Sequence, residues 1–336
     1  MNTHPRPTLY SLQIGRAVAA IAVVVHHSIF NAQALSHDVS FDWFHLFKLG
    51  YLGVDYFFVL SGFIITHVSM ASNTNAAGAK YYALSRFIRI YVPYIPATLA
   101  MLAMLALMDN TRSDYSLLAS LTLLPSHSLP VLSVAWTLQH ELVFYALFGL
   151  CAFVFKRPSL IFLWALPIVG LLFFDITQRW GQTLAGLINL EFLFGVGACY
   201  AYHSGRFKAQ RHALLLIGIA LVGIACYVLH GAAVIYQYRI IAGLGFSVIV
   251  LAVALYECTC DFSRFRTLIF LGAASYAIYL VHAPFMSLLI RLPIMYPHWA
   301  VPFILFIPLS CVAGAAYFML VERPLLRLTQ KRLLHK

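Results

Sequence analysis

Charged side chains are scarce in this sequence. Asp, Glu, Lys and Arg make up 10% of its 336 residues, 62% are hydrophobic, and the mean hydropathy is +0.85. A soluble chain with so little charge would expose apolar surface on every side, so the composition excludes that class and predicts a polytopic membrane protein. The sequence also lacks a convincing internal repeat, a low-complexity linker and an appended soluble domain. We therefore expect residues 1–336 to form a single transmembrane domain.

Acidic residues and cysteines are few as well. There are 11 acidic residues against 22 Lys and Arg, but the basic residues lie mostly between apolar runs, which is typical of topology signals and not of a nucleic-acid-binding face. Four of the six cysteines lie in apolar runs, and the pair Cys258 and Cys260 has no matching second pair. We therefore expect no disulfide framework, no metal cofactor and no nucleic-acid partner.

Ten apolar runs are long enough, or nearly long enough, to cross a bilayer. The first follows Arg6 without a small-residue cleavage site, so we interpret it as a retained helix. Before the third run, residues 80–91 alternate basic and aromatic side chains and predict an interfacial helix that enters the membrane at Pro93. The ten runs cover residues 9–31, 48–70, 92–108, 134–155, 159–174, 184–202, 213–230, 234–256, 268–290 and 300–321.

The Lys and Arg positions predict the orientation in the membrane. With ten spans, 17 of the 22 fall on the side of the two termini and five on the other side. This asymmetry favours cytoplasmic termini under the positive-inside rule. The five residues expected on the outer side are Lys48, Arg112, Arg179, Arg239 and Arg291.

Arg16 and His27 lie within the first apolar run, and ionisable residues at membrane depth are functional-site candidates. Their separation is about three helical turns, so both side chains share one helix face about 16 Å apart. His26 points about 100° away from that face. The pattern therefore predicts a functional role for His27 and a structural one for His26.

Three further ionisable residues are expected at a depth similar to that of His27. They are Asp55, Glu141 and His282, and each would cost several kcal/mol if left unpaired in hydrocarbon. We expect all four to face one polar cavity. Structural alternatives stay open: a helix-to-helix hydrogen bond for His282, a brace for Asp55 and a bridge to Tyr145 for Glu141.

Arg86 and Arg89 lie at positions i and i+3 and therefore share one helical face. Paired guanidiniums suit phosphate recognition. The spacing is equally compatible with a lipid-headgroup anchor next to a membrane span.

At these residues the sequence resembles the membrane acyltransferase family 3, bacterial O-acyltransferases that modify surface polysaccharides and lipid-linked glycans. The resemblance covers nearly the whole chain. Two positions depart from the family pattern: residues 13–17 read QIGRA, closer to the exopolysaccharide acetyltransferase branch, and Pro93 comes one residue late. The matching motifs are Arg16-x10-His27, GVDYFFVLSGF at 53–63, Arg86-x-x-Arg89, WTLQHE at 136–141, SYAIYLVHAP at 275–284 and ERP at 322–324.

The resemblance implies an all-α, multi-pass enzyme of the bacterial inner membrane. It would transfer an acyl group, most often acetyl, from acetyl-CoA to a hydroxyl of an exopolysaccharide, O-antigen or lipid-linked glycan, alongside polysaccharide-assembly proteins. We expect Arg16, Arg86 and Arg89 to bind the acyl-CoA donor. The residues expected at the acceptor are Trp136, Tyr145, Tyr276 and His282.

The expected chemistry centres on His27, because an imidazole titrates near neutrality and can deprotonate a sugar hydroxyl. Asp55 or Glu141 would hold its tautomer. A second route, an acyl-imidazole intermediate on His27, stays open. A transporter or glycan flippase that uses the same polar layer is the alternative from another class, and a scaffold for a polysaccharide export complex is a third.

Overall fold

The structure is a computed structural model, and it describes residues 9–35, 45–70, 72–108, 114–173, 178–230, 236–292 and 300–333. Three basic residues that enter the predicted orientation, Arg6, Arg112 and Lys336, lie outside these ranges. Within them, the regular secondary structure is entirely helical. This confirms the all-α fold class.

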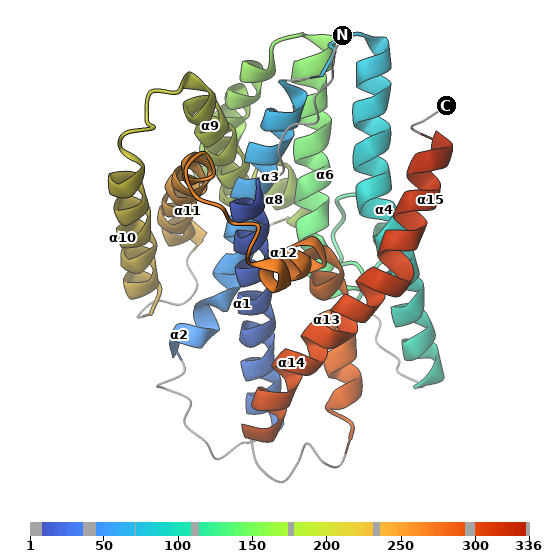
Figure 1. Ribbon diagram of the computed structural model, residues 1–336. Coiled ribbons are helices and arrows are strands. Elements are labelled where there is room, and N and C mark those ends of the chain that lie inside the picture. The colour runs from blue at the N-terminus through green and yellow to red at the C-terminus, as the bar shows by residue number, and fades with distance from the viewer. Residues whose placement is uncertain are drawn as a thin grey trace.

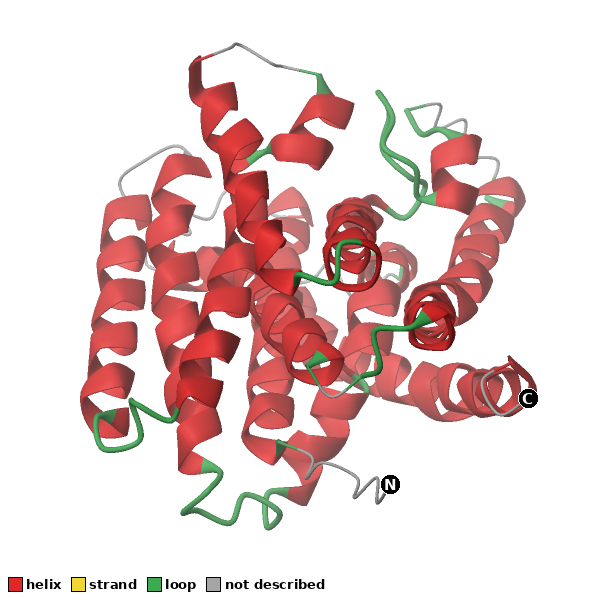
Figure 2. Cartoon of the chain, turned by 90° about the horizontal axis from the view of Figure 1, so that it is seen from above, coloured by secondary structure: helices red, strands yellow, loops and turns green. Residues whose placement is uncertain are grey.

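The helices form one bundle (Figures 1 and 2). Short 3-10 and π segments extend or join several of them. The α-helices are α1 (Tyr10–Leu35), α2 (His45–Lys48), α3 (Gly53–Ser69), α4 (Ala76–Leu107), α5 (Leu117–Thr122), α6 (Trp136–Gly149), α7 (Ala165–Gly170), α8 (Arg179–Ala185), α9 (Leu190–Ser204), α10 (Arg211–His230), α11 (Tyr236–Tyr256), α12 (Arg266–Ala273), α13 (Ser275–Leu289), α14 (Ala300–Tyr317) and α15 (Arg323–Leu333).

Eight helical stretches in the described ranges are long and apolar enough to cross a membrane. The bent pair α12–α13 adds a ninth, and Pro158–Gly170 is a shorter apolar stretch. Each of the ten apolar runs in the sequence therefore corresponds to a helical stretch. The eight are Tyr10–Ala32, Leu49–Ser69, Ala76–Leu107, Ser133–Val154, Arg179–Ser204, Arg211–Leu229, Gln237–Tyr256 and Phe303–Leu333.

Helix α4 joins the predicted interfacial segment to the third apolar run. It is one continuous helix of 32 residues (Figure 1), and Pro93, where the chain was expected to enter the membrane, lies inside it together with Pro96. Membrane helices tolerate proline where neighbouring helices support the weakened turns. Here the hydroxyls of Tyr276 and Tyr317 donate to the carbonyls of Ile90 and Pro93.

The ninth apolar run is broken at Ala274, and α12 and α13 meet there at 67°. Helix α12 lies across the bundle (Figure 1). Gly272 allows α12 to cross close to α1. Any larger residue would place a Cβ 2.0 Å from the Gln13 carbonyl oxygen of α1, which is too close for the two helices to keep this position. A broken helix at membrane depth is tolerated where its backbone is buried or lines a cavity. The break places Ser275 and Tyr276, at the start of α13, against a cavity.

Helices α3 and α9 pack at backbone contact. A Cβ on Gly62 would lie 2.0 Å from the Phe192 carbonyl oxygen, and one on Gly195 would lie 1.8 Å from that of Val59. Small residues allow such close helix packing in membranes. The adjoining core contains a stack of Phe58, Phe192 and Phe144, with ring centroids 4.5 and 4.6 Å apart.

Candidate active site

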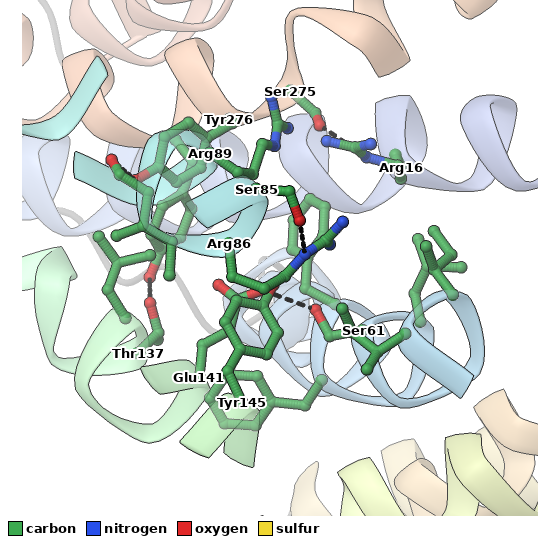
Figure 3. A pocket seen from close by; sticks show the side chains of 18 of the residues that line it. Arg16, Ser61, Ser85, Arg86, Arg89, Thr137, Glu141, Tyr145, Ser275 and Tyr276 are labelled. Atoms are coloured by element: carbon green, nitrogen blue, oxygen red, sulfur yellow. Dashed lines mark hydrogen bonds between the residues drawn. The ribbon is translucent and has the colours of Figure 1, made fainter. Parts of the chain in front are cut away.

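A cavity of about 410 Å³ lies among α1, α3, α4, α6, α13 and α15 (Figure 3). Apolar side chains of α3 line much of it, and its polar groups come from helices far apart in the sequence. Six of the ten predicted site residues line it, and the other four do not. Its polar lining consists of Arg16, Ser61, Tyr81, Ser85, Arg86, Arg89, Thr137, Glu141, Tyr145, Ser275, Tyr276, Tyr279 and Gln330.

Three guanidiniums from two helices line this cavity. The Nε of Arg16 donates to Ser275 Oγ over 3.1 Å. On α4, the guanidinium carbons of Arg86 and Arg89 lie 5.8 and 5.2 Å from the ring centres of Tyr145 and Tyr276. The i, i+3 spacing thus directs both arginines into one cavity, where they meet Arg16 from another helix. Such a cluster suits an anion with several phosphate oxygens.

Arg89 is also ion-paired. Its Nη1 lies 2.9 Å from Oε1 of Glu322, whose side chain is fully buried. Glu322 belongs to the ERP motif and lies in the π segment between α14 and α15. The ion pair fixes the last span against α4 and holds Arg89 in place beside the cavity.

Glu141 lies in this cavity with its oxygen Oε1 already bonded. The Oγ of Ser61 donates to it over 2.9 Å, and the Tyr145 hydroxyl donates to the same oxygen. Tyr82 in turn donates to the Tyr145 carbonyl. The carboxylate therefore fixes Tyr145, and with it the ring that supports Arg86 (Figure 3).

His27 and His282 form a pair of their own. Nε2 of His282 lies 3.3 Å from Nδ1 of His27, and the ring centres are 4.9 Å apart. Each Nδ1 also faces the carbonyl oxygen one turn back in its own helix, that of Val23 at 3.0 Å and that of Ile278 at 3.1 Å. A carbonyl only accepts, so a neutral imidazole here carries its proton on Nδ1 and its lone pair on Nε2.

The histidine pair is separated from the arginine-lined cavity by Tyr279. The Tyr279 ring lines the cavity, and its centre lies 5.8 Å from that of His282. Thr137 Oγ1 lies 3.0 Å from the Tyr279 hydroxyl, which also donates to the Val134 carbonyl. One fixed aromatic side chain therefore stands between the cavity and the imidazoles.

Asp55 lies in a different place. Its two oxygens accept from Nε and Nη2 of Arg239 over 3.0 and 2.7 Å, and its side chain is fully buried. The expectation that all four residues face one polar cavity is therefore wrong: the structure divides them among the cavity, the histidine pair and this ion pair. Neither carboxylate holds the His27 tautomer, because the Val23 carbonyl occupies that position. Arg239, which was counted with the residues of the outer side, is buried in the first turn of α11.

Trp136, expected at the acceptor, does not line the cavity. Its ring packs edge-on against Phe58 and His140, with centroids 6.3 and 5.4 Å away. The residues that contact the predicted set but were not predicted include Ser61, Ser275, Glu322 and Arg239. Ser61, Ser275 and Glu322 belong to the motifs that carry the family resemblance, so the sequence offered a signal for including them in the predicted site. Arg239 lies inside an apolar run. A charged residue at membrane depth needs a partner, so this position was also a signal.

Comparisons with known proteins show the family of this chain. A model of the family described as an acyltransferase domain matches residues 9–322. The chain belongs to this family. It is also similar to the exopolysaccharide production protein ExoZ of Rhizobium meliloti (strain 1021), with 29% identity over 300 residues that cover 84% of this chain and 92% of that protein. No solved structure matches the chain.

Membership in the acyltransferase family makes this chain a membrane-embedded O-acyltransferase. Acyl transfer needs a site for an activated donor and a base or nucleophile near the reacting carbonyl. The cavity supplies cationic groups that suit a charged donor, and the histidine pair beside Tyr279 contains imidazole nitrogens of the kind that act as base or nucleophile.

Proposed function

We propose that the protein transfers an acetyl group from acetyl-CoA to a sugar hydroxyl of a bacterial exopolysaccharide. The observation that carries this proposal is the sequence of groups along the bundle: three guanidiniums, then Tyr279, then the imidazoles of His282 and His27. A phosphate-bearing donor fits the first part and acyl chemistry fits the last.

The donor binds through its phosphates to Arg16, Arg86 and Arg89. Guanidiniums bind phosphate oxygens in pairs of parallel hydrogen bonds, which an ammonium group does not reproduce. Arg16 and His27 lie about 16 Å apart along α1. This separation is comparable to an extended pantetheine arm, so the thioester reaches the imidazoles while the nucleotide stays with the arginines.

His27 acts as the base through Nε2. That atom takes the proton of the sugar hydroxyl, the sugar oxygen attacks the thioester carbonyl, and the carbon–sulfur bond breaks. The departing thiolate then takes the proton from the imidazolium and leaves as coenzyme A. His282 is a positioning residue here, because its Nε2 accepts from the His27 Nδ1–H and stabilises the tautomer that the reaction needs.

The same atom permits a second route. Nε2 of His27 attacks the thioester carbonyl, the carbon–sulfur bond breaks, and coenzyme A leaves as the thiolate. The sugar oxygen then attacks the acyl-imidazole, the carbon–nitrogen bond breaks to restore the neutral imidazole, and the hydroxyl proton goes to the thiolate. In both routes the base or nucleophile is the nitrogen that the Val23 and His282 contacts leave unprotonated.

Glu141 serves the donor site and not the His27 tautomer. Its carboxylate accepts from Tyr145, whose ring supports Arg86. We therefore assign it a positioning role for the arginines.

The acceptor class rests on the relative, an exopolysaccharide production protein. The orientation follows from the basic residues: donor entry and termini on the cytoplasmic side of the inner membrane, and the histidine pair towards the outer side. Acetylation then takes place beyond the compartment that contains acetyl-CoA.

The test uses the purified full chain in nanodiscs with radiolabelled acetyl-CoA and exopolysaccharide from a strain that lacks the gene. We expect label in the polysaccharide as an alkali-labile ester, and mass spectrometry of surface glycan from the two strains should differ by acetyl groups. Flux of glycan across the membrane without a covalent product would contradict the proposal and favour a transporter.

A further inference from the structure

Three metal-ligand side chains meet at one end of the α3–α9 pair, away from the cavity. His67 is in the last turn of α3, and Cys199 and His203 lie at positions i and i+4 on α9. One possible ligand atom from each residue lies within 4.8 Å of the other two. Nδ1 of His67 and Nε2 of His203 are 3.0 Å apart, and their rings stack with centroids 5.0 Å apart.

This combination of atoms has the chemistry of a zinc site. Zinc binds imidazole nitrogen and thiolate sulfur, and tetrahedral Zn–N bonds of the usual length place two such nitrogens about 3.3 Å apart. The separation of the two imidazole nitrogens is already close to this value. Cys199 is fully buried and His203 is exposed, so an ion would be reached from the His203 side and held against the bundle.

The helix geometry favours a cation at this position. His67 and His203 both belong to the last turn of a helix, and the partial negative charge of a helix is at its C-terminus. Helix α9 ends at Ser204, and the residue that follows it, Gly205, has a left-handed φ of 68°. Two helix C-termini therefore point their carbonyl ends towards one cluster.

The spacing of the ligands is fixed before any ion binds. The backbone contacts at Gly62 and Gly195 lie five residues before His67 and four residues before Cys199. Phe63 stacks on His67 with centroids 5.9 Å apart at 12°, which restrains that ring. A preorganised set of ligands binds a metal ion without first ordering the chain.

We propose that His67, Cys199 and His203 bind one Zn²⁺ ion, with water in the fourth position. Binding releases the thiol proton of Cys199 to solvent, and the ion fastens the ends of α3 and α9 together. None of the three residues lines the arginine cavity, so the site is separate from the acyl-transfer chemistry. The sequence predicted no metal here, because His67 is far along the chain from Cys199 and His203.

The experiment measures zinc in the full-length protein, purified in detergent with a tag that contains neither histidine nor cysteine and equilibrated with Zn²⁺. We expect about one zinc per chain by elemental mass spectrometry after gel filtration. Cys199→Ser and His203→Ala should each lose most of it. The matched control is the double variant Cys258→Ser, Cys260→Ser, which removes the two exposed thiols and should keep the zinc.

A second measurement does not depend on any variant. Co²⁺ in place of Zn²⁺ should give the wild-type protein a near-ultraviolet thiolate-to-cobalt band, and Zn²⁺ should displace it. Wild-type protein without bound zinc and without this band would overturn the proposal, and so would zinc content unchanged by Cys199→Ser. In that case the cluster is a stacked and hydrogen-bonded histidine pair beside a thiol.

Discussion

His26 and His27 are adjacent in the chain, yet their rings have different surroundings. His26 points its Nδ1 at the Lys48 carbonyl and packs among Phe30 and Tyr51, whereas His27 faces His282. His27→Ala should lower acetyl transfer by about 10²–10⁴-fold, the usual contribution of a general base. The His26→Ala protein, at a matched level in the membrane, should transfer acetyl groups at a rate within several-fold of the wild type. Equal losses in the two variants would contradict the assignment to His27.

For Asp55 we predict an effect on stability, because its carboxylate is paired with the buried guanidinium of Arg239. Asp55→Asn should destabilise the protein by about 3–5 kcal/mol, since removal of one partner leaves a buried charge uncompensated. Thermal unfolding in detergent measures this loss of stability. The control is Asp261→Asn at an exposed position, which should change the stability by no more than about 0.5 kcal/mol. An Asp55→Asn protein of normal stability with much reduced turnover would instead return Asp55 to the catalytic site.

Residue types and spacing predicted that Arg16, Arg86 and Arg89 belong to one site. They did not predict the residues that these arginines contact, Ser275 and Glu322. The i, i+3 rule places Arg86 and Arg89 on one face, and the motifs identify Arg16 and Glu141. Depth along each helix, however, does not say which side of a helix faces which neighbour. For this reason Asp55 and Glu141 were expected beside His27, whereas helix rotation directs them to Arg239 and to Ser61.

At the level of elements, the close packing of α3 and α9 gives the third prediction. Gly195→Ala would place a Cβ 1.8 Å from the Val59 carbonyl oxygen, so the helices must separate, at a cost of about 2 kcal/mol or more. Gly197 on the same helix has no neighbouring atom within 4 Å of such a Cβ.

Gly197→Ala is therefore the matched control, and it should be neutral or stabilising by up to about 1 kcal/mol because alanine favours the helix. Melting temperatures of the two variants test the pair. Similar temperatures for both would show that α3 and α9 are not in backbone contact.

Helix number and position could be read from the apolar runs, because hydrocarbon thickness sets the length of a span. Interruptions could not be read in the same way. Pro93 and Pro96 lie inside a continuous helix, whereas Ala274 gave no signal although the chain bends there. Both outcomes depend on tertiary packing, which cannot be predicted from local helix propensity.

For the whole molecule, the predicted orientation can be tested with natural probes. Cys258 and Cys260 are exposed and lie in the segment between α11 and α12, on the side expected to face the cytoplasm. A membrane-impermeant maleimide should label them in inside-out vesicles and not in intact spheroplasts. The Cys258→Ser, Cys260→Ser variant shows the background, and labelling in spheroplasts would reverse the orientation.

In the proposed mechanism the arginines hold the donor while the chemistry occurs at His27. The kinetics of purified variants, with acetyl-CoA as the varied substrate, separate these two roles. Arg86 is the better probe of the donor site than Arg89, because loss of Arg89 would also leave the buried Glu322 without its ion pair.

Arg86→Ala should raise the KM for acetyl-CoA about tenfold or more while kcat changes little, as expected when a charge-assisted contact to the donor is lost. Arg86→Lys should recover only part of this, since a point charge does not replace the planar fork. His27→Ala should lower kcat with an unchanged KM. A donor KM that is the same in Arg86→Ala and wild type, or a His27→Ala enzyme with normal kcat, would contradict the account.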